Sequence, residues 1–512
     1  MTVERAGTPI DPADLSLGAI RAGQLRGRAM AVLGLARTGI ALSRFLADAG
    51  AKVSVYDGRP AGELGRAIAA LEGRAVRLLL GPAVDPADAW AGAALVATSP
   101  SIHPDFPTTE PRLRAALAGL RARRASGDPR APAILSEVDL FLRLCPAPTI
   151  GITGTKGKTT TAALAHALLA ADPRHPAVVG GNIGLPLVER LTELTPEHRV
   201  VVELSELQLP TLSRGTTVAV YTNVTADHLD RHGSLEAYRR VKRRLAELVD
   251  PAGALVLNAD DPVTASYATG ARARIAWYGL GPPRPGGLGL VDGRIVVRGL
   301  TRLDGAAVAD GPLADVTELR IPGRHNVANA MAAASAALLF GVDPLAIRAA
   351  LAAFAGVEHR LEVVTTVDGV RFVNDSQGTQ PDAVAAALRA FEPPIVLIAG
   401  GRGKDVDLSG LARVVAERAA AAVLIGETAE ELAGLFEAAG VGRIERAASL
   451  EAAVDVADAI ARTLETPGAP ATVLLSPAAA SFDMFVDYEA RGRAFKAAVS
   501  ALAERRATEA GR

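Results

Sequence analysis

The sequence predicts an α/β protein built from several domains. Its 512 residues exceed one ordinary hydrophobic core, and about 150 residues per domain is typical, which indicates three domains. Short apolar runs of strand length alternate with segments of helical periodicity, the pattern of a mostly parallel sheet covered on both faces. Polar motifs follow several of these runs, at the position where open α/β sheets bind ligands.

The composition argues against several classes of protein. Hydrophobic residues make up 49% of the chain and charged residues 22%, as in a globular protein. The 55 basic and 56 acidic residues give a formal net charge of -1, so charge gives no general reason to expect nucleic acid or an anionic membrane as partner. We find no leader-like segment and no long uncharged apolar run, so no membrane-spanning helix is expected. The sole cysteine, Cys145, excludes an intrachain disulfide and suits a reducing cytosol.

The first section begins with a strand, a turn, a helix and a second strand. The apolar run Ala29–Leu33 is followed by Gly34–Gly39, by helical periodicity over Ile40–Ala49 and by Lys52–Tyr56, with Asp57 at its end. This is the order of a Rossmann-like nucleotide-binding unit. The glycines follow G-x-x-x-x-G and not G-x-G-x-x-G, so an ordinary tight turn explains them equally well.

The rest of the chain repeats the alternation. Composition breaks near Cys145–Pro148 and Gly356 predict domains of residues 1–145, 146–355 and 356–512. Residues 277–320 are rich in Gly, Pro and Val and predict a small irregular β region. The further expected strands are Leu95–Thr98, Thr149–Ile152, His198–Glu203, Val218–Thr222, Arg371–Asn374, Ile395–Ala399, Ala422–Ile425 and Thr472–Leu475. The further expected helices are Thr160–Ala170, Leu235–Val249, Asn326–Phe340, Thr428–Ala439 and Leu450–Leu464.

The segment Gly151–Thr160 carries the clearest chemical signal. A glycine-rich turn between a strand and a helix directs backbone N–H groups and the positive end of the helix dipole at phosphate. Lys158 can bridge the β- and γ-phosphates of ATP, and the Thr159 hydroxyl can reach Mg²⁺. Ile152 stands where the strict phosphate-loop pattern has its first glycine, which leaves the shorter G-x-x-G-K-T-T.

Other polar residues stand where strands end. Glu203 ends one strand and can hold Mg²⁺ opposite the phosphate loop, although a solvated acidic loop is the alternative. Asp227 and His228 follow the next strand and offer metal or phosphate contacts. Polar loops from Asn374, Gly400 and Ser476 follow strands of the last section and form a plausible rim for a small polar ligand.

Taken in order, these motifs resemble the Mur ligases of peptidoglycan synthesis, above all the members that add glutamate to UDP-N-acetylmuramoyl-L-alanine. The resemblance runs from Ala29 to Arg493. The strings that carry it are GITGTKGKTT from Gly151, GNIGLP from Gly181, ELSELQLP from Glu203, NVTADHLDRHGS from Asn223, GRHNVANA from Gly323, HRLE from His359, NDSQGTQ from Asn374 and LLSPAAASFDMF from Leu474.

The resemblance implies a Rossmann-like N-terminal domain, a central P-loop ATPase-like domain and a Rossmann-like C-terminal domain. It implies that the first binds the UDP part of the substrate and the third binds glutamate. The residues implied for the UDP substrate are Leu35, Ala36, Arg37, Thr38, Asp57, Gly58, Arg59, Asn182, Ser205, Gln208, Asp227 and His228. Those implied for glutamate are Thr379, Lys404, Ser481 and Phe482.

The resemblance also implies an ATP site with two Mg²⁺ ions. The residues implied for ATP are Gly154, Thr155, Lys156, Gly157, Lys158, Thr159, Thr160, Asn326, Asn329, Arg360 and Asp375. Of these, Asn326 could equally be a helix cap and Arg360 a member of a surface ion pair. Thr159 and Glu203 would hold the first ion, and His228 the second, together with Lys242 carried as an anionic carbamate. Without the family, Lys242 would be an ordinary surface lysine in a basic helix. The catalytic residues implied are Lys158, Glu203, His228 and Lys242.

The implied reaction is ATP-dependent phosphorylation of the substrate carboxylate, followed by attack of the D-glutamate amine on the acyl phosphate. The expected partners are ATP, UDP-N-acetylmuramoyl-L-alanine and D-glutamate, with no nucleic acid and no membrane insertion, in a cytoplasmic monomer. Two departures stand out: Gln377 replaces a family lysine, which leaves D- against L-glutamate open, and Glu206 adds a charge near the magnesium region. A related ligase for another amino acid, such as a folylpolyglutamate synthetase, and a catalytically silent nucleotide-binding protein are the alternatives.

Overall fold

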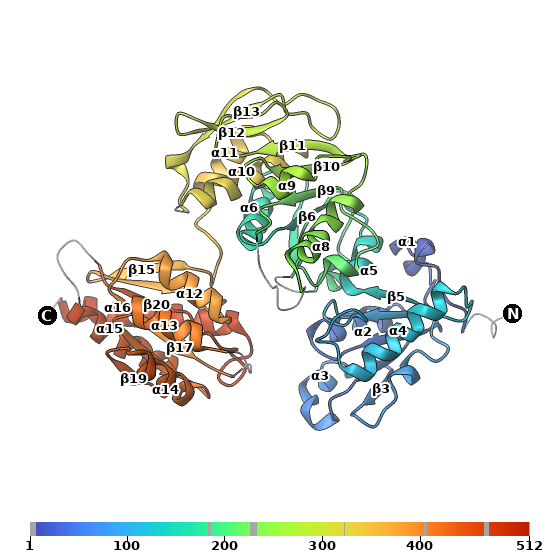
Figure 1. Ribbon diagram of the computed structural model, residues 1–512, viewed down its shortest axis with the longest axis horizontal. Coiled ribbons are helices and arrows are strands. Elements are labelled where there is room, and N and C mark those ends of the chain that lie inside the picture. Colours follow the sequence, from blue (N-terminus) through green and yellow to red (C-terminus); the bar gives the residue numbers. More distant parts are fainter. Residues whose placement is uncertain are drawn as a thin grey trace. The chain divides into compact units, whose positions relative to one another are not determined.

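The computed structural model describes residues 7–182, 186–225, 233–321, 323–403, 407–464 and 470–510. It divides the chain into two compact units, Met1–Ala355 and Gly356–Arg512 (Figure 1). The first unit holds two sheets and the second holds one, and helices pack against each sheet. The α/β class that the sequence predicts is therefore confirmed.

The first sheet has five parallel strands in the order β3-β2-β1-β4-β5. Its strands are β1 (Ala29–Leu33), β2 (Lys52–Asp57), β3 (Val76–Leu80), β4 (Leu95–Thr98) and β5 (Ala133–Ser136). Its helices are α1 (Leu17–Arg21), α2 (Arg37–Asp48), α3 (Gly65–Ala69), α4 (Pro111–Ala125) and α5 (Glu137–Leu144). Successive β1 side chains point to opposite faces, so Met30 and Val32 join one apolar cluster while Ala31 and Leu33 join another that includes Leu117 of α4.

The second sheet has nine strands in the order β14-β13-β12-β11-β10-β9-β6-β8-β7. Its strands are β6 (Thr149–Thr153), β7 (Ala177–Gly181), β8 (Arg199–Glu203), β9 (Val218–Tyr221), β10 (Ala254–Asn258), β11 (Arg274–Tyr278), β12 (Gly287–Val291), β13 (Arg294–Arg298) and β14 (Gly311–Asp315). Its helices are α6 (Lys158–Ala170), α8 (Leu235–Leu248), α9 (Pro262–Ser266), α10 (Arg324–Leu339) and α11 (Pro344–Ala353). The strands from β7 to β12 run parallel, whereas β12, β13 and β14 pair antiparallel.

The region 277–320 was expected to form a small irregular β region, and it does contain β strands. The strands β12, β13 and β14 extend the central sheet, because β12 pairs with β11, and the pairing of β13 with β14 shifts register between Ile295 and Val296. Several glycines and prolines that suggested irregularity lie in the turns between these strands, such as Gly281 and Pro282 before β12 and Gly305 before β14.

The two sheets of the first unit share a hydrophobic core. One apolar cluster contains Val32 and Phe141 from the first sheet's side and Val202 and Tyr221 from the central sheet. The short 3-10 helix η4 (Leu187–Arg190) packs against both α2 and α5. The expected boundary at residue 145 falls between these sheets, within one compact unit, so the division into three domains stays a prediction.

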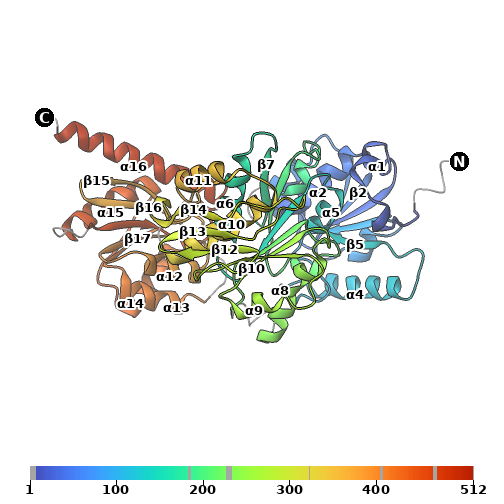
Figure 2. The ribbon, with the colours of Figure 1, turned by 90° about the horizontal axis from the view of Figure 1, so that it is seen from above.

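The second unit contains a six-stranded sheet in the order β15-β16-β20-β17-β18-β19. Its strands are β15 (Glu362–Val367), β16 (Val370–Asn374), β17 (Ile395–Gly400), β18 (Ala421–Ile425), β19 (Ile444–Arg446) and β20 (Thr472–Leu475). Its helices are α12 (Pro381–Ala390), α13 (Ser409–Arg418), α14 (Ala429–Ala439), α15 (Leu450–Leu464) and α16 (Tyr488–Ala510), the last seen lengthwise in Figure 2. All pairs except β15–β16 are parallel, so three loops that follow β16, β17 and β20 lie at one sheet edge.

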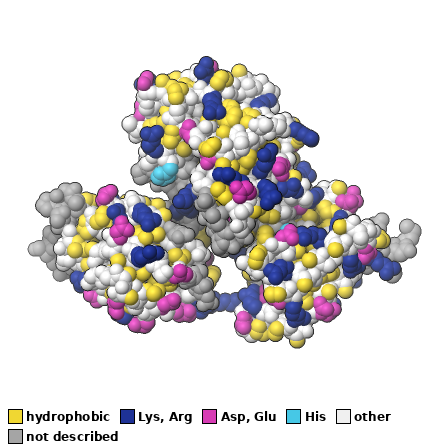
Figure 3. Space-filling view, in the orientation of Figure 1, with side chains coloured by type: hydrophobic (Ala, Val, Ile, Leu, Met, Phe, Trp, Pro, Cys, Tyr) yellow, Lys and Arg dark blue, Asp and Glu magenta, His cyan; other side chains and the backbone are white. Residues whose placement is uncertain are grey.

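Basic and acidic side chains are interspersed on the face shown in Figure 3, in keeping with the formal net charge of -1. Across the described ranges, none of the helices combines the length and the apolar character that a membrane crossing requires.

A buried carboxyl group lies where the two sheets of the first unit meet. Glu137 begins α5, is 4% exposed, and accepts a 3.0 Å hydrogen bond from the Val188 backbone N–H of η4. Burial raises the pKa of Glu137 from 4.5 to about 7, against the lowering effect of that N–H and of Arg37.

We predict that Glu137→Gln removes a pH dependence from the stability of this unit. The folded state binds the Glu137 proton more tightly than the unfolded state, so its stabilising effect is full below pH 4.5 and is lost as pH rises through about 7. A shift of this size corresponds to about 3 kcal/mol. Urea unfolding at pH 4.5 and pH 8 measures the free energy of unfolding. That of the variant should therefore increase relative to that of the wild type as pH rises. The exposed Glu72→Gln is the control, and parallel pH profiles for Glu137→Gln and wild type would contradict the prediction.

Candidate active site

The loop between β6 and α6 presents the first turn of α6 without a side-chain cap. Gly157 is the N-cap residue and, as a glycine, provides no side-chain cap for this helix. The N-terminus of a helix, with the positive end of its dipole, favours an anion. The Lys158 ammonium folds back over the loop, where it donates to the backbone oxygens of Gly154 at 3.1 Å and Thr155 at 2.8 Å.

Two glycines permit this loop to close. Gly154 has φ +150° and Gly157 has φ +85°, and both lie where neighbouring side chains approach the backbone. A Cβ on Gly154 would lie 1.9 Å from Thr222 Oγ1, and one on Gly157 would lie 2.6 Å from Asn329 Oδ1. The loop is thus held between the end of β9 and the start of α10, with no space for a larger residue at either position.

The segment 222–225, which follows β9, clasps the phosphate loop. The Thr155 N–H donates to the Asn223 backbone oxygen at 2.7 Å, and the Lys156 N–H donates to Asn223 Oδ1 at 3.0 Å. The Thr222 hydroxyl and the Asn223 amide both donate to the Lys156 carbonyl, at 2.6 and 3.0 Å. The backbone N–H groups of the predicted residues Thr155 and Lys156 therefore donate their hydrogen bonds to Asn223. Lys158, Thr159 and Thr160 lie beyond this clasp, in the first turn of α6.

Glu203 ends β8, the strand next to β6, and is 1% exposed. Its Oε1 accepts a 2.9 Å hydrogen bond from the Asn182 amide, whereas its Oε2 is buried without a hydrogen-bond partner among the described residues. The alternative of a solvated acidic loop is wrong, because β8 carries this carboxylate into the sheet. A buried carboxylate oxygen without a donor is costly, and a cation would satisfy it.

Lys242 is fully buried on α8, so the alternative of an ordinary surface lysine is wrong. Its ammonium donates to the Gly154 carbonyl at 3.0 Å and to Thr153 Oγ1 at 3.4 Å, and it lies 5.4 Å from the centre of the Tyr238 ring. The Tyr238 hydroxyl in turn lies 3.0 Å from Thr155 Oγ1. α8 therefore brings Lys242 directly against the phosphate loop.

Asn326 and Asn329 lie one turn apart at the start of α10, and the Asn329 amide donates to Asn326 Oδ1 at 3.2 Å. Asn329 is 6% exposed and approaches Gly157, as described above. The structure thus brings Asn329, one of the two α10 asparagines predicted for ATP, to the phosphate loop.

Seven of the residues predicted for the UDP substrate, 35–38 and 57–59, lie at the ends of β1 and β2. Asp57 Oδ2 accepts a 2.8 Å hydrogen bond from the Leu35 N–H, and both carboxylate oxygens accept from the Arg59 guanidinium, at 3.0 and 2.8 Å. Burial raises the pKa of Asp57, but these hydrogen bonds outweigh it and leave the pKa below its usual value. Ala36 is the N-cap of α2 and provides no side-chain cap, so Arg37 and Thr38 begin a helix with orphan N–H groups.

Ser205 and Gln208 are joined by hydrogen bonds within the first unit. The Gln208 side-chain oxygen accepts from the Ser205 N–H at 2.8 Å and from its hydroxyl at 3.1 Å. The Thr211 hydroxyl, three residues on, lies 2.7 Å from both the Gln208 carbonyl and Ser136 Oγ. This turn therefore links Glu203 to the edge strand β5 of the first sheet.

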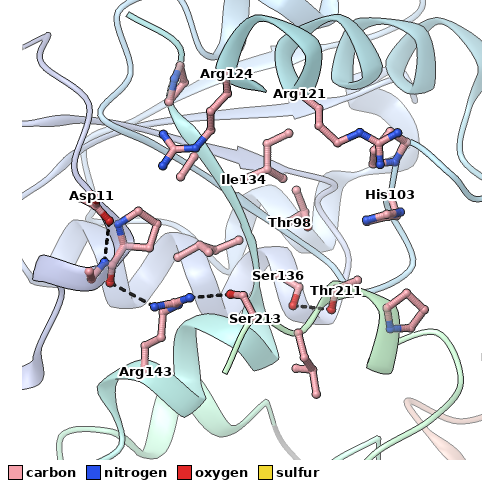
Figure 4. A pocket seen from close by; sticks show the side chains of 18 residues that line it. Asp11, Thr98, His103, Arg121, Arg124, Ile134, Ser136, Arg143, Thr211 and Ser213 are labelled. Atoms are coloured by element: carbon pink, nitrogen blue, oxygen red, sulfur yellow. Dashed lines mark hydrogen bonds between the residues drawn. The ribbon is translucent and has the colours of Figure 1, made fainter. Parts of the chain in front are cut away.

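A groove of about 470 Å³ runs beside β5, and no residue predicted from sequence lines it. Figure 4 shows Arg121 and Arg124 reaching it from α4 and Arg143 and Ser213 from the opposite side. The Arg121 guanidinium is paired with Asp105 and Arg143 with Asp139. This groove abuts the segment that contains Gln208, but it is separate from the phosphate loop.

In the second unit, Asp375 is 4% exposed and accepts from the Ser476 hydroxyl at 2.6 Å and the Leu361 N–H at 3.2 Å. Burial raises its pKa to about 6, against these two donors and the Arg360 charge. The Thr379 N–H donates to the Gln377 carbonyl at 2.8 Å, whereas Gln377 Oε1 is buried without a partner among the described residues. Ser481 is buried, and Phe482 is 56% exposed.

Three predicted site residues, Asp227, His228 and Lys404, lie outside the described residues. Among those described, no group of three or more His, Cys, Asp and Glu side chains is arranged to hold a metal. Sequence reasoning missed Asn223 and Tyr238 as loop-clasping residues. Asn223 could have been found from its place directly after a strand, but Tyr238 is brought to Thr155 only by the packing of α8.

Comparisons with known proteins agree along the chain. Residues 152–337 match the family model described as Mur ligase middle domain, and residues 359–479 match Mur ligase, glutamate ligase domain. A UDP-N-acetylmuramoylalanine--D-glutamate ligase of Symbiobacterium thermophilum is 39% identical over 477 residues, which are 92% of this chain and 98% of that protein. One of Geotalea daltonii is 37% identical over 484 residues, 94% of this chain and 99% of that protein. A UDP-N-acetylmuramate-alanine ligase structure from Thermotoga maritima covers 92% of this chain and 99% of its own, with a TM-score of 0.51 and 18% identity, and so shows likeness of fold.

The glycines of α2 and α4 provide a matched pair for testing the turn after β1. A Cβ on Gly39 would lie 1.7 Å from the Gly34 carbonyl oxygen, whereas one on Gly119 would meet nothing within 4 Å. We predict that Gly39→Ala lowers the free energy of unfolding by about 1–3 kcal/mol through overpacking. Gly119→Ala should raise it by up to about 1 kcal/mol through helix propensity. Urea unfolding measures both, and a Gly39→Ala variant as stable as the wild type would disprove the close approach.

Proposed function

Since the chain belongs to the Mur ligase family, we propose that it joins D-glutamate to UDP-N-acetylmuramoyl-L-alanine at the expense of ATP, giving ADP and phosphate, in the synthesis of peptidoglycan precursors. One observation carries this proposal beyond family membership. The phosphate loop with Lys158 follows β6, and Glu203, whose buried Oε2 has no partner among the described residues, ends the neighbouring strand β8. A catalytically silent nucleotide-binding protein would have no need of such a buried carboxylate oxygen.

We assign the ATP phosphates to the first turn of α6. The positive end of the α6 dipole favours the phosphate oxygens, and the Lys158 ammonium adds a positive charge beside this turn. The clasp formed by Asn223 fixes Thr155 and Lys156, in the loop that leads into this turn, so this part of the loop needs no reorganisation during the reaction. Asn326 and Asn329 are proposed for adenine, and Arg360 and Asp375 for the remaining phosphate and ribose contacts.

The residues present fit a magnesium ion at Glu203. Its buried Oε2 is an anionic oxygen without a donor among the described residues, and hard cations prefer such ligands. We propose that Glu203 and Thr159 hold one Mg²⁺, and that His228 and a carbamate on Lys242 hold a second. When bound, Mg²⁺ neutralises charge on the transferred phosphoryl group. Asn182, which donates to the other Glu203 oxygen, fixes the direction of the carboxylate.

Lys242 is a suitable position for a carbamate because it is buried against the phosphate loop. Carbamylation joins the neutral amine nitrogen to the carbon of CO₂ with loss of one proton, and it replaces a cation by an anionic oxygen ligand. The Tyr238 ring and hydroxyl flank this side chain and shield it from water.

The proposed chemistry has two steps. The L-alanine carboxylate of the UDP substrate attacks the γ-phosphorus of ATP, the bond to the ADP oxygen breaks, and an acyl phosphate forms. The glutamate amine then attacks the acyl carbon, phosphate leaves, and the nitrogen loses a proton to give the amide. Leu35, Ala36, Arg37, Thr38, Asp57, Gly58 and Arg59 are proposed to hold the UDP end, with Asn182, Ser205, Gln208, Asp227 and His228 nearer the reacting carboxylate.

Glutamate is assigned to the second unit, where Thr379, Lys404, Ser481 and Phe482 are proposed to bind it. Gln377 places a neutral amide where the family has a lysine, and its Oε1 lacks a partner among the described residues. This position is the reason to test the stereochemistry of the incoming amino acid. Because the substrates are ATP and a UDP-linked precursor, we place the enzyme in the cytoplasm, and we expect a monomer.

The decisive test is release of phosphate from ATP with UDP-N-acetylmuramoyl-L-alanine and a panel of D- and L-amino acids. We expect release that depends on D-glutamate, and we expect Lys158→Ala to lower kcat by at least about 100-fold, because it removes the charge that faces the phosphates. The variant should still bind the UDP substrate, because the proposed contacts to its UDP end lie on the first sheet. Phosphate release with another amino acid alone would identify a different ligase of the family, and no amino-acid-dependent release would refute the proposal.

The carbamate is tested by Lys242→Ala. We predict that this variant loses activity and that a short carboxylic acid, such as formate or acetate, restores part of it by entering the cavity as a replacement anionic ligand. Arg240→Ala, at an exposed position on the same helix, is the control and should retain wild-type turnover. An active Lys242→Ala variant that gains nothing from carboxylic acids would exclude the modification.

A further inference from the structure

The second unit contains a buried cation that no predicted role uses. Arg491, near the start of α16, is 1% exposed and ranks among the largest fully buried side chains of the chain. Arginine is rarely buried to this extent unless a carboxylate pairs with it. Among the described residues, the guanidinium donates only to neutral oxygens: to Ser376 Oγ at 3.0 Å, to the Ser376 carbonyl at 2.9 Å, and to the Ala479 carbonyl at 3.3 Å from both Nη1 and Nη2.

These acceptors belong to two of the three loops at the sheet edge. Ser376 lies in the loop after β16, which contains Thr379, and Ala479 lies in the loop after β20, which leads to Ser481. The third loop, after β17, is joined to the same group: the Arg402 N–H donates to the Ala480 carbonyl at 2.9 Å, and a Cβ on Gly401 would lie 3.3 Å from Arg491 Nη1. The guanidinium therefore holds together the loops after β16 and β20, which are proposed to bind glutamate, and it lies against the loop after β17.

The loops after β17 and β20 carry further charged side chains. Arg402 pairs with Glu427 at 3.1 Å. Asp483 is the one carboxylate that raises the pKa of Arg491, but its Oδ2 accepts from the Glu427 N–H and it makes no ion pair with the guanidinium among the described residues. Burial is the larger effect and lowers the pKa of Arg491 to about 10, so the side chain still carries its charge at neutral pH.

A buried and unmatched charge is costly, since desolvation of the guanidinium is repaid only in part by neutral acceptors. Such a cost is typical of a binding site whose ligand supplies the missing charge. Glutamate brings two carboxylates, and Gln377 contributes no charge to receive them. Ser376 and Ala479 belong to loops proposed to bind glutamate, so the guanidinium contributes positive potential to these loops.

We propose that Arg491 is a positioning residue for the incoming amino acid: it fastens the loops after β16 and β20 and provides the positive potential that attracts the carboxylates of an acidic amino acid. This inference rests on the proposed function of the second unit as the glutamate-binding part. Arg491 itself is too deeply buried to touch the substrate, and it acts through Ser376 and Ala479.

The test compares steady-state kinetics of the full-length wild type, Arg491→Met and Arg491→Lys. Arg491→Met retains bulk but removes charge and hydrogen bonds, and Arg491→Lys retains charge but loses the planar fork. We expect Arg491→Met to raise the KM for glutamate at least tenfold while the KM for the UDP substrate stays within twofold. Arg491→Lys should show a smaller rise in the glutamate KM, because the potential is partly restored. Arg493→Met removes an exposed arginine on the same helix, one that pairs with Glu489, and should behave as wild type.

A merely structural role predicts a different pattern. It would lower the thermal midpoint and kcat, or raise both KM values together, with no selective effect on glutamate, and any of these results would overturn the inference, as would a wild-type glutamate KM in Arg491→Met. If Arg491→Met fails to fold, Arg491→Lys decides the question by the same selectivity, and failure of both to fold counts against a role in binding. Failure of the proposed function is distinguished by the wild type, which would then show no phosphate release with glutamate.

Discussion

The turn between β6 and α6 is possible only because two of its residues lack a side chain. At Gly154 and Gly157 the space of a Cβ is taken by Thr222 and Asn329, which come from different elements of the central sheet. Beside these glycines, Asn223 clasps the loop and Lys242 packs against it. The glycines thus do more than admit unusual backbone angles. They let β9, α8 and α10 converge on one loop, and the proposed phosphate and metal contacts of the first unit depend on that convergence.

The two units place unmatched charge where chemistry is proposed. Glu203 in the first unit keeps one oxygen without a donor among the described residues, and Arg491 in the second keeps a cation without a carboxylate. Each arrangement lowers the stability of the fold, since burying a charge costs less free energy when an opposite charge pairs with it. In contrast, Asp57 and Arg59 are satisfied by each other and by the Leu35 N–H. The proposed UDP site needs a complementary shape and hydrogen-bond donors. The proposed Mg²⁺ and glutamate sites are instead completed by the charge of the ligand.

The fold was largely readable from the sequence where strands are apolar and separated by clear turns. Ala29–Leu33 and Thr472–Leu475 match β1 and β20, because such runs cannot be placed anywhere but inside a sheet. Short strands such as β5 and the arginine-rich helix α4 carry no such periodic signal and were missed. The residues of the proposed sites also differ in how readily the sequence predicts them. Lys158 and Glu203 stand in local motifs, and the motif was enough to find them. Tyr238 and Arg491 reach their partners across 83 and 115 residues, and only the tertiary structure brings them there.

The apolar cluster that joins Val32 and Phe141 to Val202 and Tyr221 has a consequence for how this protein can be taken apart. Residues 1–145 look like an independent module in the sequence, yet one face of their sheet is completed by the central part of the chain. Cut out or grafted onto another protein, that segment would expose a contiguous apolar face and would aggregate or bind chaperones. Exchange of modules is therefore far easier at Gly356, where the compact units divide, than at Cys145. For engineering, the N-terminal and central parts are therefore best kept together, and the second unit is the part to exchange.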